Sequence, residues 1–281
     1  MVEIVGKHDL GVGITLGASQ SIGYKGILLF GNDSQKEKYL PKLASGEHIA
    51  AFALTEPGAG SDAAGIKTRA EKQADGSWVL NGEKLWISNG GDAQIMTVFA
   101  RTKVVDASGE EKDKISAFIV DRDFGGVSSG PPERKLGIKC SQTCAVTFED
   151  TKIPAENLLG EEGQGFKIAM EILNNGRFGM GAALTGMMKR CIAGVTEHAL
   201  QRKQFGQTLA EFEAIRGKVA DMSALCYATE SLAYLVAGTM DRGATDYSIE
   251  AAASKVFASE AATHIADETV LLFGGLGFME E

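Results

Sequence analysis

The stretch of the chain that could do chemistry is a glycine-rich loop after a short apolar run. Residues 49–54 are strand-like, and the loop that follows carries two hydroxyl side chains, Thr55 and Ser61, together with Gly58 and Gly60. Glycine lets a backbone approach a ligand where a side chain would clash, and successive backbone N–H groups in such a turn form a concave anion-binding surface. The loop is therefore a candidate binding site for an anionic or a polar planar ligand.

The same loop is compatible with two folds. A glycine–x–glycine–x–x–alanine spacing from Gly58, after a strand, fits a relaxed dinucleotide fingerprint, which requires a helix and a second parallel strand to follow. Residues 66–72 contain only two apolar residues and do not read as that helix. Asn81-Gly82 then separates two strand-like runs, and this dipeptide is the strongest local signal for an antiparallel hairpin. The sequence favours an antiparallel sheet over a dinucleotide-binding fold.

The loop resembles the first signature of the acyl-CoA dehydrogenase family at every defined position from Ala53 to Gly65. Trp86-Ile87-Ser88 stands where that family has a Trp-Ile-Thr/Ser segment that contacts a flavin. The similarity extends over the whole chain. Within the family it is greatest to the very-long-chain members and to their relative in respiratory complex I assembly.

The resemblance implies flavin-dependent α,β-dehydrogenation of long-chain fatty acyl-CoA in fatty acid β-oxidation, with FAD as the cofactor. In the family a carboxylate removes the α-proton while a hydride leaves the β-carbon for the flavin. The resemblance also implies electron-transfer flavoprotein as the electron acceptor, a homodimer and a mitochondrial location. Two alternatives stay open: a non-catalytic flavoprotein scaffold for respiratory complex assembly, and an acyl-CoA oxidase that passes electrons to oxygen.

The resemblance also assigns cofactor contacts. Thr55 and Ser88 would hydrogen-bond the flavin, and Trp86 would pack against its ring. Arg202 and Phe205 would reach the flavin of a neighbouring subunit, since the planar fork of an arginine can grip a diphosphate. Without the resemblance, the basic turn there, which a glycine follows, would be ordinary helix capping. The expected cofactor-binding residues are Phe52, Leu54, Thr55, Gly60, Ser61, Trp86, Ile87, Ser88, Arg202, Phe205, Gly274 and Gly275.

A second set of residues is expected to contact the acyl-CoA. Gly13 and Gly17 are four residues apart, on one face of an expected helix, where medium-chain relatives carry larger polar residues that floor the acyl pocket. The alternative is close helix packing, because an interior glycine costs about 1 kcal/mol relative to alanine. Thr102 could instead be a hydroxyl residue just beyond a strand end with no contact to substrate. Arg177 could instead be a helix residue that simply faces water. The full set is Ser61, Thr102, Asn174, Arg177, Gly13 and Gly17.

The composition is ordinary for a globular protein but acidic in balance. Apolar residues make up 44% of the chain and charged residues 23%, with a net charge of −9. That balance argues against non-specific nucleic-acid binding, which needs a basic surface. No uncharged apolar run reaches the length of a membrane span, which is about 18 residues or more. The four cysteines have neither Cys-x-x-Cys spacing nor a nearby histidine, so we expect reduced, mostly buried thiols and no metal site.

We expect an α+β protein of acyl-CoA dehydrogenase-like fold: an antiparallel β-domain between helical segments, with a truncated C-terminal helical bundle. Its parts would be a remnant of the N-terminal helical domain over 1–45, the β-domain that binds flavin and acyl-CoA over 46–160, and an incomplete helical bundle over 161–281. Interruptions are expected at Pro41 and at 174–177. The expected strands include 95–101, 115–120 and 145–148, and the expected long helices are 166–198, 212–241 and 248–272.

Relative to the family, the chain looks truncated at both ends. It lacks most of the N-terminal helical domain, shows no targeting segment, and stops at Glu281, before the segment that holds the family's catalytic glutamate. Some relatives keep that base immediately before the helix arginine, where this chain has Gly176. We therefore expect no catalytic base within these residues and little turnover by the chain alone, because losing a positioned base costs about 10²–10⁴-fold in rate.

Overall fold

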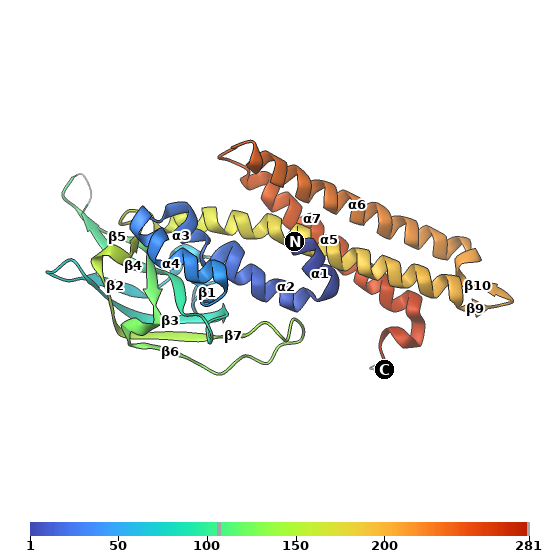
Figure 1. Ribbon diagram of the computed structural model, residues 1–281, viewed down its shortest axis with the longest axis horizontal. Helices are drawn as coiled ribbons and strands as arrows, with labels where there is room; N and C mark the ends of the chain where they lie inside the picture. The colour runs from blue at the N-terminus through green and yellow to red at the C-terminus, as the bar shows by residue number, and fades with distance from the viewer. Residues whose placement is uncertain (106–107, 280–281) are drawn as a thin grey trace. The chain divides into compact units, whose positions relative to one another are not determined.

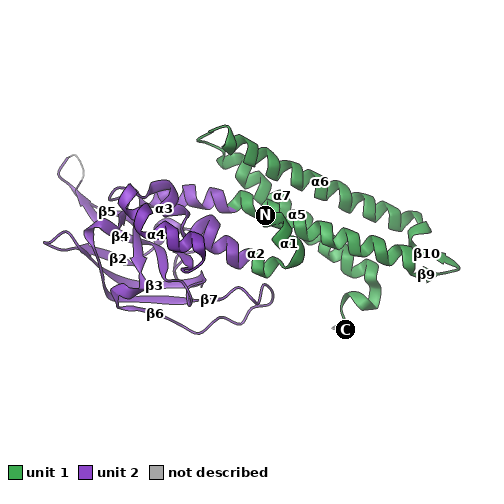
Figure 2. Ribbon diagram, in the orientation of Figure 1, with its two compact units in different colours: residues 1–13, 177–281 green, residues 14–176 purple. Residues whose placement is uncertain are grey.

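The structure is a computed structural model that describes residues 1–105 and 108–279. It contains two compact units, one of residues 1–13 and 177–281 and the other of residues 14–176 (Figure 2). The expected α+β class with a helical bundle is confirmed. The expected domain boundaries, 1–45, 46–160 and 161–281, differ from those of the two compact units. They follow the change from helices to strands and back to helices, and this division stays a prediction.

The elements run in the order helices, strands, helices (Figure 1). The first helices are α1 (Val2–His8), α2 (Leu10–Gly17), the π-helical turn η1 (Ala18–Gly23), α3 (Lys25–Phe30) and α4 (Asp33–Ser45). The strands of the sheet are β1 (Ala50–Ala53), β2 (Arg69–Lys72), β3 (Trp78–Ser88), β4 (Ile95–Val105), β5 (Glu111–Asp121), β6 (Val127–Ser129), β7 (Thr143–Ile153) and β8 (Leu158–Leu159). The last part comprises α5 (Gly165–Gln201), the short strands β9 (Lys203–Gln204) and β10 (Gln207–Thr208), α6 (Glu213–Asp241) and α7 (Ser248–Phe273).

The sheet of residues 14–176 is mixed, which corrects the expectation of a purely antiparallel one. Its strand order is β6-β7-β3-β2-β4-β5-β8, and β1 also pairs with β4. β1 and β2 run parallel to β4, whereas the other described pairs of this sheet are antiparallel. The chain leaves β1 through the glycine loop and returns beside it as β4 only after β2 and β3. A connection of this length can join parallel neighbours, which a tight turn cannot.

Residues 95–100 of β4 and 115–120 of β5 are buried on both faces. On one face Phe99 and Ile119 pack with residues of α3, α4 and the first part of α5. On the other face Val98 and Phe118 pack with residues of β3 and β7, and the rings of Phe118 and Trp78 are 5.2 Å apart. Strands that are buried on both faces have continuous apolar sequences, whereas strands buried on one face alternate apolar and polar residues. The strands expected over 95–101, 115–120 and 145–148 are confirmed within β4, β5 and β7.

The hairpin expected at Asn81-Gly82 is wrong. β3 runs through both residues in pairing with β7, and a shift of register between Leu80 and Gly82 marks a bulge. Gly82 has φ 147°, and a Cβ there would lie 2.5 Å from Thr68 Oγ1. The glycine is therefore required by the close approach of another segment. The tight turn lies instead at Gly76 (φ 86°), between β2 and β3.

The two expected helix interruptions are also wrong. α4 continues through Pro41, with a capping box at Asn32 that satisfies its first N–H groups. α5 continues through 174–177. A Cβ on Gly176 would lie 2.9 Å from Ile22 Cγ2, so this glycine accommodates a packed neighbour rather than ending the helix.

In the other unit α5, α6 and α7 lie side by side (Figure 1) around buried residues that include Met188, Met222 and Ile265. The helices expected over 212–241 and 248–272 are confirmed to within one residue at their ends. α1 crosses α5 at two glycines. A Cβ on Gly6 would lie 2.2 Å from the carbonyl oxygen of Ala183, and a Cβ on Gly186 would overlap the backbone of α1.

We predict that Gly186→Ala destabilises the protein by at least about 1–3 kcal/mol, because the methyl group would force α1 away from α5. Gly217→Ala is the matched control. Gly217 is exposed on α6 and has no other heavy atom within 4 Å of a Cβ, so alanine should stabilise the helix by up to about 1 kcal/mol. Thermal unfolding of the two variants checks the prediction. Equal midpoints would contradict the close crossing.

Candidate functional site

The glycine loop begins where β1 ends and starts with a tight turn. The backbones of Glu56 and Ala59 exchange two hydrogen bonds of 3.0 and 3.1 Å, which places Gly58 at the tip. A Cβ on Gly58 or on Gly60 would have no other heavy atom within 4 Å, and Ser61 is exposed. The tip therefore presents open backbone and a hydroxyl side chain, as a ligand-binding nest requires.

The structure brings this loop against the end of β3. The N–H of Leu85 donates to the carbonyl of Thr55 at 2.9 Å, which places the start of the loop beside Trp86. Trp86 is 63% exposed and has φ 55°. The register shift between Lys84 and Ile87 marks a second bulge, where the indole turns outward. A bulky residue in the left-handed region is strained, and such strain is typical of functional sites.

Asn89, which sequence analysis missed, anchors the end of the same segment. It is buried with φ 61°, a conformation that asparagine tolerates better than most residues. Its side-chain amide donates to the carbonyl of Thr15 at 3.1 Å, and its N–H donates to the carbonyl of Gln142 at 2.8 Å. These bonds fix the point where Ser88, which is half-buried, leaves β3.

A buried ion pair closes the loop. The ammonium of Lys84 lies 2.7 Å from Glu56 Oε1 and donates to the carbonyl of Leu54 at 3.1 Å. The carboxylate of Glu56 also accepts the backbone N–H of Lys67 at 2.5 Å and that of Thr68 at 3.0 Å. A single carboxylate thus joins the start of the loop to its end and to β3.

Both members of the pair have perturbed pKa values. Burial lowers the pKa of Lys84 to about 8, against the hydrogen bond and charge of Glu56. Burial alone would raise the pKa of Glu56, but hydrogen bonds from Lys84, Thr68 and Lys67 outweigh it and hold that pKa below its ordinary value. Both groups are therefore charged at neutral pH.

The sequence did contain a signal for this pair. Side chains of a strand alternate between its two faces, and Lys84 is in phase with Trp78 and Leu80, which are buried. A lysine in the inward phase requires a buried acidic partner, and the adjacent loop carries two acids, Glu56 and Asp62. The sequence analysis did not identify this pair or its role in holding the loop.

Other predicted cofactor residues near the loop face the core. Leu54 and Ile87 are buried, so they could contact a cofactor only through their backbone atoms. Phe52 is half-buried and packs on Phe99, with ring centroids 5.0 Å apart. Among the predicted set in this unit, the side chains of Ser61 and Trp86 are exposed, and those of Thr55 and Ser88 are half-buried like that of Phe52.

Thr102 was expected just beyond the end of a strand, and this expectation is wrong. It lies within β4 and is buried. Its hydroxyl is 2.7 Å from that of Ser116, which also accepts the N–H of Gly163 at 2.8 Å. The hydroxyl of Thr102 is thus bonded within the protein, and a contact with CoA stays a prediction.

The two glycines expected in the acyl pocket lie on α2. A Cβ on Gly13 would meet Val5 Cγ1 at an ordinary 3.8 Å, and a Cβ on Gly17 would have no other heavy atom within 4 Å. Gly23 differs, because a Cβ there would lie 2.9 Å from Ala50. Close packing therefore explains Gly23 but does not require glycine at positions 13 and 17.

Asn174 and Arg177, expected to contact substrate, lie on α5 and are half-buried. Asn174 belongs to the unit of residues 14–176 and Arg177 to the other unit.

The remaining predicted cofactor residues gather at one end of the helical bundle. Phe205 is 93% exposed and has φ 55° in the turn between β9 and β10. Gly274 (φ 62°) follows the last residue of α7. The rings of His198 and Phe273 stack 4.7 Å apart, which joins the ends of α5 and α7. The predicted residues at this end are Arg202, Phe205, Gly274 and Gly275.

Across residues 1–105 and 108–279, no helix is long and apolar enough to cross a membrane. No group of histidine, cysteine or acidic side chains in those ranges is placed to hold a metal ion. None of the four cysteines, all of which the structure describes, forms a disulfide, and Cys140 is exposed.

Comparison with known proteins decides the family. Models of the acyl-CoA dehydrogenase N-terminal, middle and C-terminal domains match residues 1–47, 51–151 and 163–281. A short-chain specific acyl-CoA dehydrogenase of Megasphaera elsdenii is 44% identical over 100% of the chain and 72% of its own length. The chain belongs to the acyl-CoA dehydrogenase family. Members of this family are oxidoreductases, and the homologues are FAD-dependent.

The mitochondrial very long-chain specific acyl-CoA dehydrogenase of Homo sapiens is 61% identical over the full chain, which spans 43% of that relative's length. Among solved structures, butyryl-CoA dehydrogenase from Megasphaera elsdenii has a TM-score of 0.93 at 43% identity, covering 99% of this chain and 72% of that one. An acyl-CoA dehydrogenase from Bacillus anthracis complexed with FAD has a TM-score of 0.90 at 43% identity, covering 99% and 50%. A chain in a structure of the electron transferring flavoprotein of Acidaminococcus fermentans has a TM-score of 0.91 at 41% identity, covering 99% and 72%.

We predict that Lys84→Met lowers the free energy of unfolding by about 3–5 kcal/mol, because it leaves the buried charge of Glu56 without a partner. Lys103→Met is the matched control. Lys103 lies 2.9 Å from Glu111, but these side chains are 63% and 55% exposed, and such a pair contributes about 0–1 kcal/mol. Denaturant unfolding of both variants checks the difference. Similar losses would contradict the special role of the buried pair.

The depressed pKa of Glu56 predicts a defined pH dependence. The contribution of the Glu56 carboxylate to the free energy of unfolding is complete above the ordinary carboxyl pKa of about 4.3. It is lost as the pH falls through the lower pKa that Glu56 has in the folded state. The stability difference between the wild type and Glu56→Gln should therefore be full near about pH 6 and shrink below about pH 4. Urea unfolding over that range measures it. A difference that stays constant with pH would show that Glu56 has an ordinary pKa.

Proposed function

We propose that this chain contributes an FAD site at residues 52–61 and 86–88, and that the whole protein catalyses α,β-dehydrogenation of fatty acyl-CoA. The observation that carries the proposal is the open glycine tip, which is held beside the exposed and strained Trp86 by the Leu85–Thr55 hydrogen bond. Family membership supports it, as does the likeness to a solved relative that is complexed with FAD.

The residues present fit a flavin. Its ring system is planar with polar edges, and Trp86 supplies an exposed flat surface for packing. Thr55 is bonded through its carbonyl to Leu85, the residue before Trp86, and Ser88 follows Trp86 by two residues. The absence of a Cβ at Gly58 and Gly60 leaves room for the close approach of a bulky cofactor. FAD, when bound, supplies the acceptor for the hydride that leaves the β-carbon.

The remaining chemistry belongs to the substrate's α-carbon. An α-proton of a thioester is only weakly acidic, so hydrogen-bond donors must face the thioester oxygen, where enolate charge develops. We place Ser61, which is exposed on the loop, in contact with the substrate, together with Asn174 of the same unit. A contact from Arg177 is a separate prediction from the family resemblance. We therefore assign to this chain's own residues the positioning of the substrate and the stabilisation of the enolate charge.

The finer proposal is that the substrates are long-chain and the pathway is β-oxidation in mitochondria, with electron-transfer flavoprotein as acceptor. It is supported by the 61% identity to a mitochondrial very-long-chain enzyme and by the likeness to a chain solved with an electron transferring flavoprotein. We further propose a homodimer. The exposed Phe205 and its neighbour Arg202 suit a contact with another subunit better than isolation in water.

The test uses the whole protein, purified and reconstituted with FAD. We predict flavin absorbance that palmitoyl-CoA bleaches under anaerobic conditions. Trp86→Ala should raise the dissociation constant of FAD about two- to twelvefold, since aromatic packing contributes about 0.5–1.5 kcal/mol. Leu136→Ala, at a fully exposed apolar position, should not change it. Absence of flavin uptake after reconstitution would contradict the proposal, and rapid oxygen consumption during turnover would identify an oxidase instead.

The substrate length can be tested at α2. If Gly13 and Gly17 line the acyl pocket, Gly13→Gln and Gly17→Glu should selectively reduce turnover of long acyl chains, because the new side chains fill volume that the longer tail needs. Shorter substrates should keep most of their kcat/KM. Measuring kcat/KM across a series of acyl lengths checks this. Equal loss for short and long substrates would instead indicate disturbed helix packing.

A further inference from the structure

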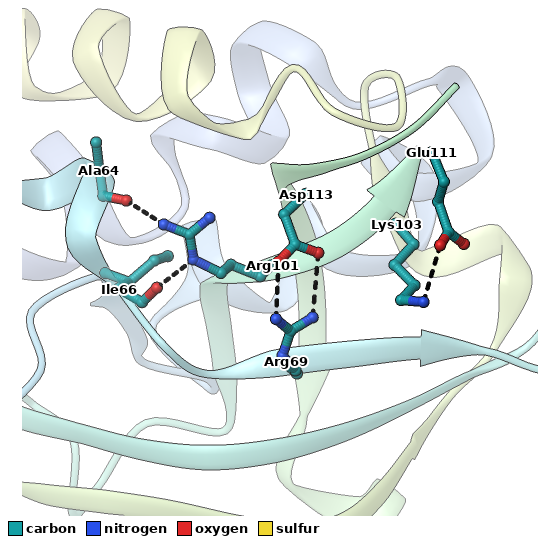
Figure 3. Close-up of polar contacts among 7 residues, drawn as sticks. All are labelled: Ala64, Ile66, Arg69, Arg101, Lys103, Glu111 and Asp113. Carbon is teal, nitrogen blue, oxygen red and sulfur yellow. Dashed lines mark hydrogen bonds and ion pairs between the residues drawn. The ribbon is translucent and has the colours of Figure 1, made fainter. Parts of the chain in front are cut away.

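The far end of the glycine loop is held by Arg101, a residue of β4. Its Nε donates to the carbonyl of Ile66 at 2.6 Å, and its Nη2 donates to the carbonyl of Ala64 at 2.6 Å (Figure 3). Both carbonyls belong to the short segment by which the chain leaves the loop. The planar guanidinium can hold two carbonyls at once, which the single ammonium of a lysine does less well.

The charged neighbours on the same face have other partners. Arg69 forms two hydrogen bonds of 2.8 and 3.2 Å with Asp113, and Lys103 pairs with Glu111 at 2.9 Å (Figure 3). Asp113 and Glu111 are thus paired with Arg69 and Lys103, whereas the guanidinium of Arg101 donates to the backbone of the loop. Hydrogen bonds from a charged donor are shorter and stronger than neutral ones.

Together, Arg101 and Glu56 fix the loop at both ends. Glu56 joins the start of the loop to the N–H groups of Lys67 and Thr68, and Arg101 fixes the residues immediately before them. The part between them, with Gly60 and Ser61, presents open backbone. A loop with fixed ends loses less conformational freedom when a ligand binds, which favours affinity.

We propose that Arg101 is a positioning residue, which holds residues 60–66 in the ligand-binding conformation without touching the ligand. This inference rests on the proposed function, since the ligand is FAD. Arg101 acts through two backbone carbonyls, so its removal frees the second half of the loop while Thr55 and Trp86 keep their places. Removal of the Arg101 side chain should therefore weaken the binding of FAD as well as reduce turnover.

The test compares three variants of the whole protein, freed of FAD and titrated with it by flavin fluorescence. Arg101→Met should raise the dissociation constant at least about tenfold. Arg101→Lys should restore part of the affinity, because an ammonium can still donate to one carbonyl. Arg69→Met is the matched control on the same face. It breaks an exposed ion pair and should stay within about twofold of the wild type.

A second readout needs no cofactor. Lys67 is exposed, and tryptic cleavage after it in the FAD-free protein reports opening of the loop. Cleavage should be faster in Arg101→Met than in Arg69→Met. A lower melting temperature with unchanged FAD affinity and unchanged cleavage would overturn the inference. If the wild type binds no FAD, the proposed function fails, and the cleavage rates alone still decide whether Arg101 positions the loop.

Discussion

The conformation of the candidate site depends on one buried ion pair. Burying an ammonium and a carboxylate removes both from water, and their mutual attraction offsets that loss only when further hydrogen bonds satisfy them. Lys84 and Glu56 meet this condition, because the carboxylate accepts two backbone N–H groups and the ammonium donates to a carbonyl as well. Such a pair contributes little net stability compared with apolar residues of similar volume. Its effect here is to select one conformation of the loop.

That selection lets strained backbone persist beside the loop. Trp86 and Asn89 both have positive φ, and strain of this kind costs about 1–3 kcal/mol at each residue. The flanking residues are over-determined, since Leu85 is bonded to the loop, Ile87 is buried in the sheet, and Asn89 is bonded to two other segments. The packed sheet thus holds an exposed indole in one orientation before any ligand arrives.

The sequence predicted the elements whose pattern is set by burial. β4 and β5 read as apolar runs because both of their faces are covered, and α6 and α7 read as helices because their apolar spacing is helical. The errors arose where a local signal has a tertiary cause. Gly82 and Gly176 are glycines because Thr68 and Ile22 approach them, not because the chain turns or breaks there. The loop and Trp86 were predicted by their resemblance to a family signature. Asn89 and Arg101 were missed, because a bond to a distant carbonyl leaves no mark on sequence spacing.

The central claim is that Glu56 and Lys84 set the loop conformation before the cofactor binds. Amide hydrogen exchange of Lys67 and Thr68 in the FAD-free protein tests it most directly, because both N–H groups donate to the Glu56 carboxylate. Slow exchange of these two amides without FAD, lost in Lys84→Met, is the predicted result. Fast exchange in the FAD-free wild type, with protection only after FAD is added, would show that the cofactor orders the loop and would contradict the account.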